Sequence, residues 1–193
     1  DVAVAREFVS NPAPNFEMLP LRRLRPPEIQ AWGEKPHRGK GAGEYSLVID
    51  QKTAAALVRA TCGYFPLLRQ FRDHCERTMT RASEYYPSEQ HVETFRKGLT
   101  PQKLYNVLLS PLEAVELDTL RSLLNQAIDL DLAQPRLDRA WAQELILDGV
   151  QYEAELNARL NALDLLVLLD LMSEQHGYLI FDNHALLKVA LGL

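Results

Sequence analysis

The chain has 193 residues, of which 47% are hydrophobic, 24% charged and 8% aromatic, as in a globular protein with one large core or two small ones. The densest apolar run, residues 163–172, contains Asp164 and Asp170 and is shorter than the roughly 20 apolar residues of a membrane span. Cys62 and Cys75 are too few for a disulfide framework and, with no visible signal segment, favour a cytoplasmic location.

The net charge of −5 conceals an asymmetry along the chain. Residues 1–48 carry a net +1 and residues 49–100 a net +2, whereas residues 101–193 carry −8. A basic first half joined to an acidic second half is not the signature of a chain that binds nucleic acid over its whole length. It equally favours self-complementary contact, within one chain or between copies.

Residues 1–44 differ in composition from the rest. They contain six of the eleven prolines, which remove backbone donors and prevent a long helix. They also carry many apolar side chains, more than a solvated linker usually has. We therefore expect an extended arm with hydrophobic anchors over residues 1–44, ending in a mobile loop at residues 35–43.

From residue 45 the signals are mainly helical. Start and stop residues predict helices at about 51–62 (Asp50 as N-cap), 66–86, 88–97 and from 101, and one at 111–129 that a Ser110–Glu113 capping box opens. Leu137, Trp141 and Leu145 mark the core side of the next region, and Gly177 resembles a helix C-cap.

The last third holds the most apolar helix and the one clear strand. Leucines fill most of the helix circumference between Tyr152 and Leu171, which predicts a central helix or an oligomer seam. Residues 178–181 read as a strand. Asp182-Asn183 then either caps a last helix over residues 185–191, the option we favour, or turns a small hairpin.

These predictions define a mainly all-α fold. We expect an extended Pro/Gly-rich arm and loop at residues 1–44 and a multi-helix bundle at residues 45–193, with at most one short C-terminal strand or hairpin.

The most reactive-looking residues are His74 and Cys75. A thiol beside an imidazole supplies a nucleophile and its base, or two metal ligands. Neighbours on a helix diverge by about 100°, however, and both residues lie on the apolar stripe, so a core position is the simpler interpretation. A zinc site that adds Cys62 and His91 lacks a short-spaced ligand pair.

Two other features offer weaker chemistry. Residues 39–43 resemble a phosphate loop in composition, but no Rossmann or P-loop motif is present and a linker explains them better. A buried Asp164 or Asp170 would be a candidate acid, yet six residues of separation place the two carboxylates on different helix faces, and a basic partner would neutralise either. Both more simply mark where the helix meets solvent or another element.

The absence of a catalytic constellation and the apolar arm favour a protein–protein interaction module (an adaptor, chaperone-like or regulatory subunit) over an enzyme. Its partner would be another protein or a second copy, and we expect no cofactor, no metal and no membrane span. The candidate partner-binding residues are Phe16, Leu19, Leu21, Arg22, Arg23, Arg25 and Trp32.

Two alternatives remain open. In the first, Arg22, Arg23, Arg25, Arg38 and Lys40 contact nucleic acid. In the second, the chain is a helical enzyme or metal protein built around His74 and Cys75, with His91 nearby in sequence.

Overall fold

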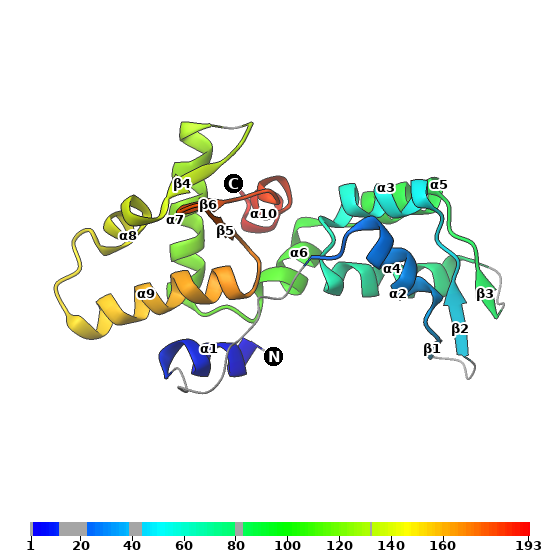
Figure 1. Cartoon of the computed structure of the whole chain (residues 1–193), viewed down its shortest axis with the longest axis horizontal. Helices are drawn as coiled ribbons and strands as arrows, with labels where there is room; N and C mark the ends of the chain where they lie inside the picture. Colours follow the sequence, from blue (N-terminus) through cyan, green and yellow to red (C-terminus); the bar gives the residue numbers. More distant parts are fainter. Residues whose placement is uncertain (1, 12–22, 39–43, 80–82, 132) are drawn as a thin grey trace. The chain divides into compact units, whose positions relative to one another are not determined.

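A computed structural model describes residues 2–11, 23–38, 44–79, 83–131 and 133–193. The chain divides into two compact units, which are treated separately below: unit 1 comprises residues 1–21 and 108–193, and unit 2 comprises residues 22–107. Both are mainly α-helical, with one small three-stranded sheet in the described part of each (Figure 1). Within the described ranges, no helix combines the length and the apolar character that crossing a membrane requires.

Unit 2 is a set of helices around an aromatic core. Its elements are α2 (Pro26–Glu34), β1 (His37–Arg38), β2 (Glu44–Leu47), α3 (Gln51–Thr61), α4 (Phe65–Thr78), β3 (Glu84–Tyr85), α5 (Glu89–Lys97) and α6 (Pro101–Leu104). The sheet order is β1-β2-β3, with β1 antiparallel and β3 parallel to β2. Local signals fix three helix starts: Asp50 and Thr100 accept backbone hydrogen bonds as N-caps, and Ser88 opens α5 as predicted.

Unit 1 is a leucine-rich helical assembly. Its elements are α1 (Val2–Ser10), α7 (Ala114–Leu130), β4 (Arg136–Asp138), α8 (Arg139–Leu147), α9 (Glu153–Leu168), β5 (Ser173–Gln175), β6 (Tyr178–Ile180) and α10 (His184–Leu191). Helices α7, α8 and α9 pack on one another, and α1 lies along α9 (Figure 1). The antiparallel sheet β4-β6-β5 pairs Leu137 with the buried Leu179. A π-helical turn, η1 (Tyr105–Leu109), spans the boundary between the units.

Several boundaries differ from the sequence predictions. The helix predicted at 66–86 ends at Thr78, because Tyr85 instead pairs with Leu47 in the sheet and its side chain is buried there. The helix predicted from residue 111 starts at Ala114, since Glu113 and Glu116 form its capping box in place of Ser110. The sequence offers two pairs of capping residues three apart, Ser110 with Glu113 and Glu113 with Glu116. The helix uses the second pair, after the π-helical turn that ends at Leu109.

Three predictions near the C-terminal end of the sequence also need correction. Gly177 turns the β5–β6 hairpin and does not end a helix. A helix C-cap and a tight hairpin turn both use a residue with positive φ, so the glycine by itself does not distinguish them. Trp141 is 37% exposed, whereas Ala142 and Ile146 face the core of unit 1. Leu137 is buried, as predicted for the core side, but it lies in a strand and does not continue the helical spacing of Trp141 and Leu145. The predicted strand at 178–181 and the last helix are confirmed as β6 and α10.

Two further segments differ from expectation in part. The expected extended segment at residues 1–44 contains the helices α1 and α2, each nine residues long, and Pro26 and Pro27 occupy the first turn of α2, where proline is tolerated. In α9, the buried side chains all lie in its second half, between Ala162 and Leu166, so the helix is not surrounded by protein along its length.

Candidate interaction site

One arginine connects helix α1 to the rest of unit 1. The guanidinium of Arg6 donates from Nε to Oε1 of Glu116 (2.6 Å) and from Nη2 to Oε2 of the same carboxylate (2.9 Å). Nη2 also donates to the carbonyl of Pro111 (3.1 Å), and Nη1 lies 3.2 Å from a carboxylate oxygen of Glu113. A two-point arginine–carboxylate pair fixes orientation as well as distance. This cluster therefore fixes α1 at the N-terminal end of α7, while the helix itself lies along α9.

The receiving carboxylate is built into the start of α7. Glu116 is buried, and its Oε2 also accepts a hydrogen bond from the backbone N–H of Glu113 (2.8 Å), which closes the capping box of the helix. A carboxylate in the first helical turn is further stabilised by the helix dipole. The hydrogen bond to Glu116 raises the pKa of Arg6 above its usual value, and burial opposes that shift. Glu116 is thus held in place for a cation by the fold of α7 itself.

Apolar contact contributes less to this docking. Ala5 is the one fully buried residue of α1, whereas Val2, Phe8 and Val9 are half-buried and Val4 is 57% exposed. A hollow of about 280 Å³ remains between Val9 and Ser10 of α1 and the small side chains of α9, among them Ala154 and Ala158. A helix that buries its larger apolar side chains only in part, beside a hollow, is held less firmly than a core helix. The α1 surface of unit 1 is therefore anchored by charge and loosely packed.

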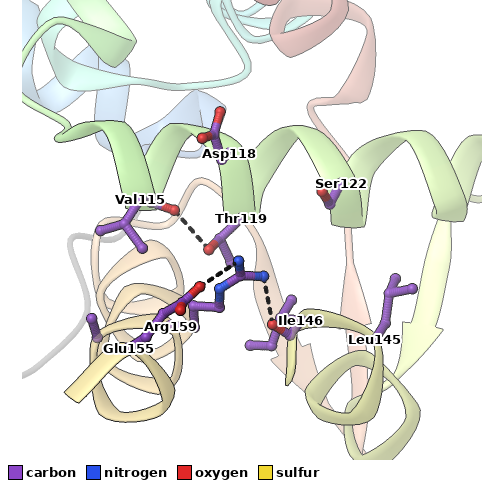
Figure 2. A pocket seen from close by; sticks show the side chains of 9 residues that line it. Val115, Asp118, Thr119, Ser122, Leu145, Ile146, Glu155 and Arg159 are labelled. Carbon is purple, nitrogen blue, oxygen red and sulfur yellow. Dashed lines mark hydrogen bonds and ion pairs between the residues drawn. The ribbon is translucent and has the colours of Figure 1, made fainter. Parts of the chain in front are cut away.

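A larger cavity, of about 530 Å³, adjoins this hollow and is lined by α7, α8 and α9 (Figure 2). Val115 and Ala158 line both spaces. Arg159 points across the cavity, where its guanidinium donates to the carbonyl of Ile146 (2.9 Å) and to Glu155 (2.8 Å) (Figure 2). The hydroxyl of Thr119 donates to the carbonyl of Val115. The cavity thus joins three helices and holds a paired arginine, but its lining has no nucleophile placed beside a base.

Unit 2 has a polar cavity of similar size beside His74, with lining residues from α4 and α5 and with Lys103. Burial lowers the pKa of His74, and the electrostatic effects of Arg77, His91 and Lys103 lower it further. Cys75 is fully buried, and burial raises the pKa of its thiol to about 12. A protonated, enclosed thiol is a poor nucleophile and a poor metal ligand.

The residues of the imagined zinc site have other surroundings. Nδ1 of His91 accepts a hydrogen bond from the backbone N–H of Ser88 (3.1 Å) at the start of α5. Cys62 is half-buried, with left-handed backbone after α3. In the part of the chain that the structure describes, no three His, Cys, Asp or Glu side chains gather as metal ligands would. The described geometry therefore gives no support to metal chemistry around His74.

The two aspartates of the apolar helix lie where it meets other elements. Asp164 is exposed and forms an ion pair with Arg139 of α8 (2.5 Å), whose guanidinium also pairs with Glu174 of β5. Asp170 follows α9 with a φ of +56°, so it belongs to the turn after the helix. Neither residue is fully buried.

Of the partner-binding residues predicted from the sequence, Phe16, Leu19, Leu21 and Arg22 lie outside the described residues, as does the 39–43 loop with Lys40. The others belong to unit 2. The guanidinium of Arg23 lies over the ring of Tyr64 (5.8 Å), and exposed Arg25 precedes α2. Trp32 is half-buried between His37 (5.1 Å) and Phe65 (6.1 Å).

The charge asymmetry of the sequence becomes larger when it is counted by unit. Unit 2 has fifteen basic and nine acidic residues, a net +6, and unit 1 has six and seventeen, a net −11. Sequence reasoning nevertheless missed Arg6 and Glu116, because the partners are 110 residues apart. The available signal was the Glu113/Glu116 spacing, which is typical of any helix start and does not identify a distant arginine.

Comparison with known proteins gives no relative: no protein family, no curated protein and no solved structure matches the chain.

Proposed function

We propose that this chain is a protein–protein interaction module in which unit 1 receives a short arginine-bearing helix on the α7–α9 surface. One observation carries the proposal: α1 occupies such a surface, with Arg6 bound at two points to the buried carboxylate of Glu116. In this proposal α1 is the resident ligand in the same chain, and a partner helix of similar chemistry replaces it. Exchange of a helix in a groove is a mode of recognition that fits an adaptor, chaperone-like or regulatory subunit.

The energetics of α1 support an exchangeable helix. An isolated helix of nine residues is marginal in water, so α1 gains its order from docking. The docking contacts are a partly exposed ion pair, the buried Ala5 and the half-buried side chains of Val2, Phe8 and Val9, beside a hollow. Solvent-exposed ion pairs contribute about 0–1 kcal/mol, and the Arg6 side chain of this pair keeps 29% of its surface exposed. A partner helix with an arginine at the same place and a larger apolar face would therefore compete with α1.

The partner chemistry follows from the receiving surface. Glu113 and Glu116 select a cation, and the small side chains Ala154 and Ala158 admit close approach of a second backbone. The net charge of −11 on unit 1 favours a basic partner and speeds its encounter. We therefore expect an amphipathic, basic helix with a small residue next to its anchoring arginine, as in Ala5-Arg6.

A peptide assay on the full chain tests this proposal. The Arg6→Glu variant places a carboxylate against Glu113 and Glu116 and should release α1. A labelled peptide of residues 1–11 should then bind this variant, with a dissociation constant on the order of 0.1–1 mM, and bind the unmodified chain at least about tenfold more weakly. Fluorescence anisotropy measures both. The matched control is Arg121→Glu, the same charge change on the exposed side of α7. The Arg121→Glu chain should bind the peptide as weakly as the unmodified chain does.

The peptide supplies its own control. A second peptide that carries Arg6→Glu should not bind either chain, since it repels the two glutamates. Equal binding of both peptides, or no binding of the first peptide to the Arg6→Glu chain, would contradict an arginine-selective helix groove.

The charge of unit 2 favours a second candidate function, binding to nucleic acid. Its net +6 includes Arg25 and the 89% exposed side chain of Arg38, whose nearest carboxylate, on Glu44, is 3.9 Å away. This candidate predicts binding to oligonucleotides that weakens steeply with salt. The double variant Arg25→Glu, Arg38→Glu should weaken it, and Arg121→Glu of unit 1 should not. An absence of binding at low salt would dispose of it.

A further inference from the structure

A cluster of aromatic rings joins the sheet of unit 2 to helix α2. His37 of β1 lies between the rings of Trp32 (5.1 Å between centroids) and Tyr45 (5.8 Å), and Tyr45 packs edge-on against Tyr85 of β3 (5.0 Å). His37, Tyr45 and Tyr85 are all buried. The imidazole therefore fills the space between α2 and β2.

Two polar atoms in this cluster have no hydrogen-bond partner: Nε2 of His37 and the hydroxyl of Tyr45. A buried polar group without a partner costs about 1–3 kcal/mol, and such groups are rare in folded proteins. A protonated imidazole would place an additional N–H, and a full charge, in the same enclosed position. The cluster thus tolerates neutral His37 and opposes its charged form.

The surroundings of the imidazole also disfavour its charged form. Burial lowers the pKa of His37, and the cation of Arg72 on α4 lowers it further, whereas a hydrogen bond to the backbone of Trp32 opposes the shift. Tyr45, with its pKa raised to about 12 by burial, stays neutral near its neighbours Glu76, Asp73 and Tyr85. Arg38 and Glu44, the next pair of the β1–β2 ladder, are exposed. No carboxylate is among the groups that shift the pKa of His37.

We propose that β1 is an acid-released edge strand, which leaves the sheet when His37 is protonated and uncovers the aromatic face of Trp32. The strand has two residues, and the second, Arg38, contributes an exposed side chain. The imidazole is therefore the side chain that holds β1 in place. Phe65, which packs edge-on against Trp32, is 45% exposed, so release of His37 joins two aromatic side chains into one accessible surface.

The sign follows from where the proton binds more tightly. In the closed strand the pKa of His37 lies below 6.5, and in the released strand it returns to about 6.5. The released form therefore binds more protons, and it gains population as the pH falls below about 6.5. The rest of unit 2 stays folded, because α2 is anchored by the fully buried Ile29 and β2 remains paired with β3.

Tryptophan fluorescence of the full chain tests the proposal. Trp141→Phe leaves Trp32 as the single tryptophan, and its emission and acrylamide quenching are followed from about pH 8 to about pH 5. We expect a red shift and stronger quenching with a midpoint below 6.5, at constant far-ultraviolet circular dichroism. His37→Phe keeps an aromatic ring without a titrating group and should abolish the transition. His74→Gln, at the other unit 2 histidine with a lowered pKa, should leave it unchanged.

A second measurement covers the case in which His37→Phe fails to fold. In the unmodified chain, the imidazole resonances of His37 and the indole N–H resonance of Trp32 should titrate together. A transition that persists in His37→Phe, an indole resonance that ignores the titration of His37, or a simultaneous loss of helical signal would overturn the release of β1.

Discussion

Unit 1 and unit 2 differ in what fills their cores and in how tightly the backbone is packed. The core of unit 2 contains the buried rings of Tyr45, Tyr64, Phe71, Tyr85 and Phe95, whereas Phe181 is the buried aromatic residue in the described part of unit 1, where leucine dominates. Rings pack in specific geometries, and leucines adapt more easily. Unit 2 should therefore tolerate substitution less well than unit 1.

The glycines show the same difference. Gly63 of unit 2 has a φ of +72°, and a Cβ placed there would lie 2.3 Å from the carbonyl oxygen of Leu24. Gly177 of unit 1 has a similar φ of +80°, but a Cβ there would have nothing within 4 Å. The two positions share their backbone strain and differ in space alone, so they isolate the effect of packing.

The largest expected effect is that of Gly63→Ala. Left-handed backbone costs about 1–2 kcal/mol for an alanine, and the clash with Leu24 adds to it, so unit 2 should lose at least about 3 kcal/mol of unfolding free energy. Gly177→Ala should cost unit 1 about 1–2 kcal/mol. Each unit has one tryptophan, Trp32 in unit 2 and Trp141 in unit 1, so urea unfolding of the two single-tryptophan chains reports each unit separately. Equal losses of unfolding free energy in Gly63→Ala and Gly177→Ala would contradict the difference in packing between the two units.

A buried amide gives a smaller effect in unit 1. The side chain of Asn183 is enclosed and donates from Nδ2 to the carbonyl of Leu171 (3.0 Å). Asn183→Ala leaves that carbonyl without this donor and should cost about 1–3 kcal/mol, seen at Trp141 and not at Trp32. Asn125→Ala, at an exposed position of α7, is the matched control and should stay within about 0.5 kcal/mol of the unmodified chain. A loss at Trp32 as large as that at Trp141 would show that the units do not unfold separately.

The features that the sequence predicted correctly depend on neighbouring residues. Asp50, Ser88 and Thr100 open their helices through hydrogen bonds within one turn, so each signal is complete in a few residues. Tyr85 shows the opposite case. Its spacing continues the stripe of α4, and only its distant partner Leu47 assigns it to a strand.

The candidate site was less predictable than the fold, for the same reason. The residues proposed as anchors were chosen for apolar character within the first 44 residues, whereas Arg6 acts through a carboxylate far along the chain. Trp32 was proposed as an anchor for a partner, but His37 and Phe65 of unit 2 pack against its ring. Composition identifies a side chain that needs a partner, but the topology decides which partner is near.

The smallest expected effect is that of Arg6→Ala on global stability. Removing one member of a buried ion pair usually costs about 3–5 kcal/mol, because the other charge stays buried. Here α1 can leave, and Glu116 then reaches water while still accepting its hydrogen bond from Glu113. The loss of unfolding free energy at Trp141 should accordingly stay below about 1 kcal/mol. Hydrogen exchange of residues 2–10 should rise to the rate of an unprotected chain, with protection of α7 retained.

This prediction separates an exchangeable helix from a part of the core. Glu116→Ala should cost unit 1 more than Arg6→Ala, because it removes both the anchor of α1 and the capping box of α7, the latter contributing about 0.5–2 kcal/mol. If Arg6→Ala instead lowered the stability of unit 1 by about 3 kcal/mol or more, α1 would be a structural element that no partner helix displaces. The leucine core of unit 1 would then depend on α1, and unit 1 would not tolerate substitution better than unit 2. The proposed groove for a partner helix would be contradicted by the same result.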